Sequence, residues 1–361
     1  MAETGRRRRW DPSGPLTSGW RRFWSWTEGH PHLRAALKLL RRRWLETIAV
    51  ASLLGLVLAV DPIKLGAAYR ALHFTYALLM VPTVLAVYVF RGLGWWIALR
   101  RLGVRVGLLR TVVIMFAGQT LIFMPTGDLA RVALLRESGA DERDEGTLAG
   151  SITFQELVFM TLLGLGVLTR VLARPDVALL VLLMTAVHGG IFTLLIWKPA
   201  YERAVGLVER VQLLRRFDRQ LRSLRPAFMA MIEPRAMLGI TVCNALAACS
   251  MFVLFQLALR AVGVDSVGVL ETAFVYGLAH LLGGLSLLPS GMGSMEAIMV
   301  VLLAGQGVPA ASGAAAAVLF RLYNDAFMAV LGIGAAWLLR HHWGRRSERA
   351  EAPEQASAEE S

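Results

Sequence analysis

The chain has 361 residues, of which 56% are hydrophobic, with a mean hydropathy of +0.54 and a formal net charge of +12. Most of the arginines flank apolar segments, where basic residues orient membrane proteins and contact anionic lipid, so we expect no nucleic-acid partner. The two cysteines, Cys243 and Cys249, form neither a CxxC motif nor a metal-ligand pattern.

Several apolar stretches are long enough to cross a ~30 Å hydrocarbon layer as helices. The alternation typical of β-strands is not evident, and lipid requires each segment to satisfy its own backbone hydrogen bonds. The sequence therefore predicts an all-α polytopic membrane protein.

The first half of the predicted membrane domain covers residues 44–197 and follows a basic, Trp-bearing cytoplasmic or interfacial segment at residues 1–43. A short amphipathic piece is expected at Ile63–Leu72, and a basic interfacial stretch at Arg91–Arg110. Thr111–Met124 is too short to cross and ends at Pro125, which predicts a re-entrant hairpin that returns through Asp128–Glu137. The full spans predicted in this half are Trp44–Val60, His73–Phe90, Thr147–Leu168 and Val177–Trp197.

Residues 198–235 are strongly basic with helical periodicity, and they predict an amphipathic cytoplasmic linker to a second half at residues 236–340. In that half Ala236–Leu259 and Ala314–Leu339 are predicted spans. Between them, Val267–Leu288 and Met292–Leu303 form a second broken pair. The membrane domain thus ends near residue 340, and the charged tail at residues 341–361 is expected to be disordered.

The charges of the loops predict the orientation of the chain. Basic loops fall on the cytoplasmic side if both termini are cytoplasmic and the two broken pairs enter the membrane from opposite faces. Such an arrangement is typical of an inverted repeat.

Two similar strings mark the two breaks. Residues 123–131 read Phe-Met-Pro-Thr-Gly-Asp-Leu-Ala-Arg, and residues 287–296 read Leu-Leu-Pro-Ser-Gly-Met-Gly-Ser-Met-Glu. Proline ends a helix and glycine permits a tight turn, so these strings predict helix breaks that expose backbone dipoles to a polar cavity. Ordinary loop punctuation is the alternative. The break residues are Pro125, Gly127, Pro289, Gly291 and Gly293.

Charges near the breaks are candidate ligands for a lipid headgroup. Arg131 and Glu156 are 25 residues apart, as are Glu296 and Arg321. Charged residues at membrane depth are costly and need partners. Glu296, Glu156 and the local Asp325 are the alternatives for Arg321. Arg131 is either an interfacial arginine or a phosphate ligand, and Glu296 either a favourable charge at a helix start or a site residue.

At these residues the chain resembles the flippase-like membrane-domain family, the family of the transmembrane half of lysylphosphatidylglycerol synthase. The similarity lies in Pro125, Gly127-Asp128 and Arg131, in the run from Pro289 to Glu296, and in Arg321. Residues 155–159 read Gln-Glu-Leu-Val-Phe where the family often has Glu-Arg-x-x-Asp. The resemblance implies two re-entrant halves around a lipid-accessible cavity, with site residues at Asp128, Arg131, Glu296 and Arg321. Glu156 is added to the candidate headgroup-binding residues as a predicted intramembrane charge.

We therefore expect a multi-pass protein of the bacterial inner membrane that translocates a phospholipid or lipid-linked headgroup, or assists its translocation. The expected partners are an anionic lipid substrate and the membrane, with a homo-oligomer or biosynthetic partner left open. No cofactor, metal or catalytic residue is expected, and too few residues follow Arg340 for the soluble aminoacyl-transfer domain of bifunctional relatives. The alternatives are a membrane-embedded lipid-modifying transferase and a scaffold subunit of an envelope-lipid biosynthesis complex.

Overall fold

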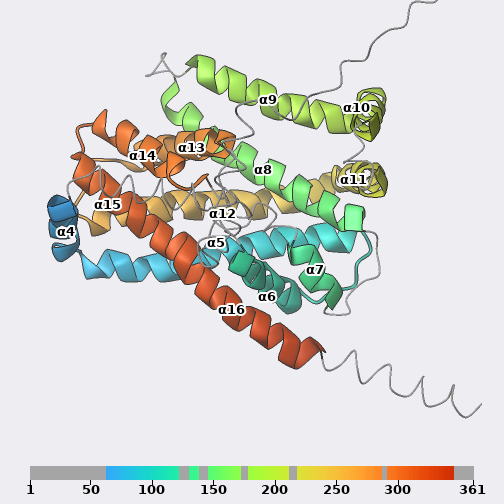
Figure 1. Cartoon of the computed structure of the whole chain (residues 1–361), viewed down its shortest axis with the longest axis horizontal. Coiled ribbons are helices and arrows are strands. Elements are labelled where there is room, and N and C mark those ends of the chain that lie inside the picture. Colours follow the sequence, from blue (N-terminus) through green and yellow to red (C-terminus); the bar gives the residue numbers. More distant parts are fainter. Residues whose placement is uncertain are drawn as a thin grey trace, which may run out of the picture. The chain divides into compact units, whose positions relative to one another are not determined.

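The computed structural model describes residues 62–121, 130–137, 145–171, 178–210, 218–286 and 291–344, all within one compact unit at residues 49–361. Over these ranges the chain consists of helices joined by turns and short connections, without strands (Figure 1). The predicted all-α polytopic class is confirmed. The first predicted span, Trp44–Val60, the segment before it and most of the tail lie outside the described residues.

Four helices in the described part of the chain are long and apolar enough to cross a membrane. They are α5 (Phe74–Arg101), α8 (Glu145–Val171), α12 (Pro234–Ala261) and a long helix over residues 310–344. The last consists of α15 (Ala310–Arg321), the π-helical η6 (Leu322–Phe327), α16 (Met328–Leu339) and the π-helical η7 (Arg340–Gly344). The 28 residues of α5 extend about 42 Å, more than the ~30 Å of a hydrocarbon layer.

Two pairs of shorter helices lie between the long ones. The first pair is α6 (Leu108–Gly118), continued by η1 (Gln119–Leu121), with α7 (Ala130–Glu137) packed against it. The second pair is α13 (Val269–Leu285) and α14 (Ser294–Ala304), which also contact each other. Eleven residues of helix extend only about 16 Å, so α6 and α14 are too short to cross alone. The inverted relation between the pairs stays a prediction.

The remaining helices are α4 (Pro62–Arg70), α9 (Ala178–Ile196), α10 (Lys198–Arg210) and α11 (Asp218–Met231). α9 matches a predicted span, and apolar side chains such as Leu182 and Ile191 are exposed on it, as expected for a helix in lipid. α10 and α11 form helices within the predicted linker. Phe228 of α11 is buried against Phe154 of α8, with ring centroids 5.0 Å apart.

The prediction that Arg91–Arg110 forms an interfacial stretch is wrong for its first half, because α5 continues without a break to Arg101. α5 packs along α12, as Figure 1 shows, and buries Trp95, Ala98 and Leu99 completely. This burial stabilises the helix beyond residue 90, so Arg91 is an interior residue and not an interfacial one.

The crossing of α8 and α13 depends on glycine. A Cβ atom on Gly277 would lie 2.6 Å from the carbonyl oxygen of Leu163, and one on Gly166 would lie 2.8 Å from that of Ala273. Small residues let helix backbones approach closely in membranes, where packing rather than the hydrophobic effect drives association. The glycines therefore permit the close contact of these two helices.

We predict that Gly277→Ala destabilises the protein by roughly 1–3 kcal/mol, because the added methyl group forces α8 and α13 apart. The measurement is the temperature of unfolding of the purified protein in detergent. Gly189→Ala on α9 is the matched control, since no atom lies within 4 Å of its Cβ position. An equal unfolding temperature for Gly277→Ala and wild type would contradict the close crossing.

The predicted orientation can be tested at two exposed side chains, Glu202 on α10 and Asp265 in the turn after α12. In a background with Cys243→Ala and Cys249→Ala, we expect a membrane-impermeant maleimide on intact cells to label Asp265→Cys and not Glu202→Cys. Permeabilised cells are the control and should show both labels. The reverse pattern on intact cells would overturn the orientation.

Candidate functional site

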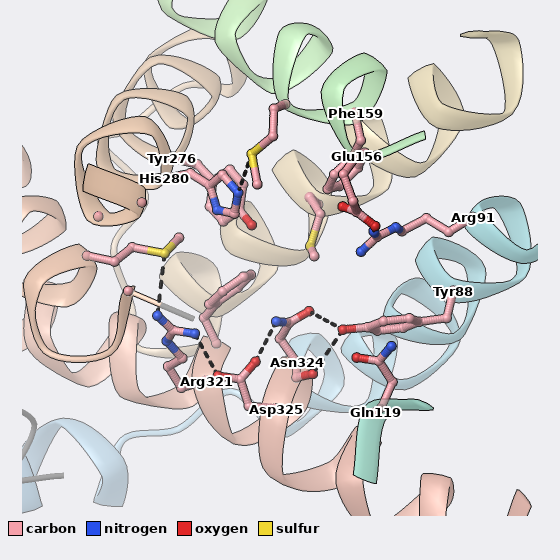
Figure 2. A pocket seen from close by; sticks show the side chains of 17 residues that line it. Tyr88, Arg91, Gln119, Glu156, Phe159, Tyr276, His280, Arg321, Asn324 and Asp325 are labelled. Atoms are coloured by element: carbon pink, nitrogen blue, oxygen red, sulfur yellow. Dashed lines mark hydrogen bonds and ion pairs between the residues drawn. The ribbon is translucent and has the colours of Figure 1, made fainter. Parts of the chain in front are cut away.

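A cavity of about 240 Å³ lies among α5, α8, α13 and the junction of α15 with η6. Four charged residues line it: Arg91, Glu156, Arg321 and Asp325. Figure 2 shows Arg91 and Glu156 on one side of this cavity and Arg321 and Asp325 on another. Apolar helices surround these charges, which marks the cavity as the candidate functional site.

On the α5–α8 side, two guanidinium groups share one carboxylate. Arg91 and Arg131 each donate through Nη2 to Oε1 of Glu156, and the Arg131 distance is 2.9 Å. Arg91 also lies over the ring of Phe159, with its Cζ 4.6 Å from the ring centroid. Its Nε is buried and has no hydrogen-bond acceptor among the described residues.

Arg131 is 0% exposed and reaches Glu156 from α7. The Cγ of Arg131 packs against Gly118. A Cβ atom on residue 118 would lie only 2.7 Å from this Cγ, so a side chain larger than that of glycine would collide with Arg131. Its Nη1 lies 3.3 Å from the sulfur of Met115, and its Cζ lies 5.8 Å from the ring centroid of Trp95. Arg131 itself does not line the cavity, so it acts on the site through Glu156.

On the opposite side, two carboxylates share one guanidinium group. Arg321 donates through Nε to Oε1 of Glu296 and through Nη1 to Oδ2 of Asp325, the latter at 2.6 Å. Glu296 is 1% exposed and does not line the cavity. Its place behind Arg321 allows it to orient the guanidinium group.

The start of α14 holds Glu296 in position. Its Oε2 accepts a hydrogen bond of 2.6 Å from the backbone N–H of Gly293, the residue before the helix. Gly291 and Gly293 have φ angles of 63° and 82°, in the left-handed region that side chains disfavour. The two predicted break glycines thus form the turn that directs the carboxylate toward Arg321.

A hydrogen-bonded chain connects the two sides of the cavity (Figure 2). The hydroxyl of Tyr88 donates to Oδ1 of Asn324 at 3.2 Å, and Nδ2 of Asn324 donates to Oδ1 of Asp325 at 2.7 Å. Asn324 and Asp325 lie in the π-helical segment η6, and π segments inside helices are frequent at functional sites.

Aromatic residues complete the lining. Tyr276 stacks on His280 and meets Phe320 edge to face, with centroid distances of 5.7 Å and 5.3 Å. A ring nitrogen of His280 lies 3.2 Å from the sulfur of Met160. Met160 also lines a second, mostly apolar cavity of about 510 Å³ between α8, α9 and α13, so the two cavities are neighbours.

The structure brings together four of the predicted headgroup ligands in their two pairs, Arg131 with Glu156 and Glu296 with Arg321. Of the alternatives for Arg321, Glu296 and Asp325 are its partners, whereas Glu156 is paired with Arg91 and Arg131. The other predicted site residues lie outside the described residues: Pro125, Gly127, Asp128 and Pro289. The described ranges contain no cluster of His, Cys, Asp or Glu that could hold a metal ion.

Sequence reasoning missed Arg91, Tyr88 and Asn324. A signal for Arg91 was present, because apolar and aromatic residues and glycines run on both sides of it from Val84 to Leu99. A single arginine in such a run is an intramembrane charge that needs a partner. Tyr88 and Asn324 carried no comparable signal, because their roles arise from contact between α5 and η6.

We predict that Glu156→Gln lowers the free energy of unfolding by roughly 1–3 kcal/mol, because Arg91 and Arg131 lose the carboxylate they share in a largely buried place. The unfolding temperature in detergent measures this effect. The control is Glu202→Gln, which removes an exposed ion pair with Lys198 at 3.7 Å and should change little. Equal unfolding temperatures for the two variants would contradict a structural role for Glu156.

Comparison with known proteins agrees with this architecture. Residues 44–332 match the family described as the lysylphosphatidylglycerol synthase TM region. A search of curated proteins found no match. The family match includes both short helix pairs and every charged residue of the cavity. The chain is therefore a multi-pass membrane protein that belongs to the family of the lysylphosphatidylglycerol synthase transmembrane region.

Proposed function

We propose that this protein translocates a phospholipid or lipid-linked polar headgroup across the inner membrane, or assists its translocation. The observation that carries the proposal is a charged cavity enclosed by apolar, membrane-length helices and bordered by two pairs of short helices. A polar headgroup crossing a hydrocarbon layer requires such a path, since its desolvation is otherwise costly.

Arginine at the cavity supports a phosphate-bearing headgroup. Guanidinium groups bind phosphate oxygens through paired hydrogen bonds, and both Arg91 and Arg321 line the cavity. The buried Nε of Arg91 has no acceptor among the described residues, so Arg91 keeps a donor that its ion pair with Glu156 does not use. Arg91 is therefore the first contact we assign to the phosphate.

The neighbouring apolar cavity supports a lipid rather than a free anion. Its lining includes Leu165, Leu168 and Phe192, and Met160 borders both cavities. An amphiphile can place its headgroup among the charges and an alkyl chain against this apolar lining. A soluble anion would have no use for the second cavity.

The ion pairs supply a way to bind and release the headgroup. Without a ligand, Glu156 and Asp325 keep the guanidinium groups paired. A phosphate that enters exchanges with these carboxylates, so charge stays neutralised throughout. The chain belongs to a family named after the transmembrane region of a phospholipid synthase, which supports a lipid as the substrate.

The sharpest test of translocation is Arg91→Gln in proteoliposomes with labelled envelope phospholipids. We expect protein-dependent exchange between leaflets to fall at least about tenfold, the effect of losing one charge-assisted contact. Arg131 still pairs with Glu156 in this variant, so the protein should fold, and its unfolding temperature checks this.

Arg170→Gln is the matched control, because Arg170 pairs with Glu271 and lines neither cavity. Wild-type protein that changes the leaflet exchange of no envelope lipid would argue against translocation. Turnover of a lipid donor by the purified wild type would favour the transferase alternative.

A further inference from the structure

The charged residues that line the cavity balance one another in the described part of the chain. Arg91 and Arg321 are positive, and Glu156 and Asp325 are negative. Each arginine pairs with the carboxylate on its own side. Opposite charges in an apolar bundle offset part of each other's desolvation cost, so a balanced set is far more stable there than an unbalanced one.

An anionic headgroup upsets this balance, because a phosphodiester brings one negative charge. Its phosphate takes the place of a carboxylate at an arginine, so the guanidinium group stays paired and the carboxylate is released. When Arg91 releases Glu156, that carboxylate still has Arg131, whose Nη2 lies 2.9 Å from its Oε1. Glu156 therefore keeps a counter-ion when a phosphate binds.

Asp325 keeps no such partner when Arg321 binds the phosphate. Its Oδ2 pairs with Nη1 of Arg321 at 2.6 Å, and its Oδ1 accepts a hydrogen bond from the neutral amide of Asn324 at 2.7 Å. Among the described residues Arg321 is its only ion-pair partner, and Glu296 shares that arginine. Because Asp325 is 3% exposed, its released carboxylate would be a buried charge without a counter-ion.

The other ionisable groups at the cavity include no further lysine or arginine in the ranges that the structure describes. They are, with Glu296 behind the lining, Tyr88 and Arg91 of α5, Glu156 of α8, Tyr276 and His280 of α13, Glu296 of α14 and Arg321 of α15. The two arginines hold the phosphate in this state. A proton from water neutralises the released carboxylate directly, and His280 is the rival site for that proton.

We propose that Asp325 is a proton-binding residue, and that each anionic headgroup bound in the cavity takes up one proton with it. This inference rests on the proposed translocation function and names its ion coupling. The proton converts the Asp325 carboxylate into a carboxylic acid, so two arginines, Glu156 and the phosphate leave no net charge. The acid also donates a hydrogen bond to a phosphate oxygen, which a carboxylate cannot do. When the headgroup leaves, the proton returns to water and Asp325 pairs with Arg321 again.

Binding of the lipid and binding of the proton are then linked, and each strengthens the other. Uptake of one proton per lipid means that the Kd for an anionic lipid falls by up to about tenfold for each unit by which the pH is lowered, and rises as the pH is raised. A pH difference across the membrane therefore acts as a driving force for the movement of the lipid.

The test is isothermal titration calorimetry of the purified full chain in detergent with a short-chain phosphatidylglycerol, which carries one net negative charge. Titrations in two buffers that differ in ionisation enthalpy give both the lipid bound and the protons taken up. For the wild type near neutral pH we expect about one proton per lipid, and for Asp325→Asn about none, with a Kd that does not change with pH. This ratio does not depend on how much of the protein is folded.

Glu271→Gln is the matched control, because Glu271 pairs with Arg170 and lines neither cavity, and it should keep the wild-type ratio. His280→Asn should also keep it. Loss of proton uptake in His280→Asn and not in Asp325→Asn would overturn the assignment to Asp325.

The coupling and the proposed function fail in different ways. Wild-type protein that binds the lipid without taking up a proton, and still exchanges it between leaflets in proteoliposomes, would overturn the coupling and leave translocation intact. Wild-type protein that neither binds nor exchanges the lipid would contradict both.

Discussion

A charge inside an apolar helix bundle requires a partner, and this requirement holds the short helices of this protein in place. Arg131 fixes α7 to α8 through Glu156, and Glu296 fixes α14 to α15 through Arg321. α7 has 8 residues and α14 has 11, so neither crosses a hydrocarbon layer alone. Separating either helix from its neighbour would leave buried charges without a counter-ion, which is far more costly than losing apolar contacts of the same size. The polar gap is therefore a stable part of the fold.

The same ion pairs decide which groups face the cavity. Arg131 and Glu296 are almost completely buried and do not line it, whereas their partners Glu156 and Arg321 do. In each pair one residue thus orients the other, and the orienting residue comes from the short helix. Glycine at residues 291 and 293, with positive φ, makes the turn that allows Glu296 to do so. The helix break before α14 therefore positions Glu296, and Glu296 in turn positions the Arg321 guanidinium group that lines the cavity.

Much of this arrangement was predictable from the sequence, and the exceptions have physical causes. Apolar length predicted most described helices, and the two separations of 25 residues correspond to two real ion pairs. Arg91 was assigned to an interface because Trp95, Trp96 and four further arginines follow it in the stretch to Arg110, a pattern that buried packing against α12 overrides. The π segment was not predictable, because contact between Tyr88 and Asn324 belongs to the tertiary structure. Nor could spacing alone decide which acids pair with Arg321.

The arginines that line the cavity are already paired with carboxylates, and this pairing limits how tightly the cavity can bind an anionic headgroup. In the proposed function, a phosphate at Arg91 would have to compete with Glu156, and one at Arg321 with Asp325. The net free energy of binding is the difference between two sets of ion pairs and is therefore much smaller than either set. A path across a membrane needs this property, since a headgroup must be held well enough to enter and weakly enough to leave. An unpaired arginine in the same place would bind phosphate more tightly and would retain it.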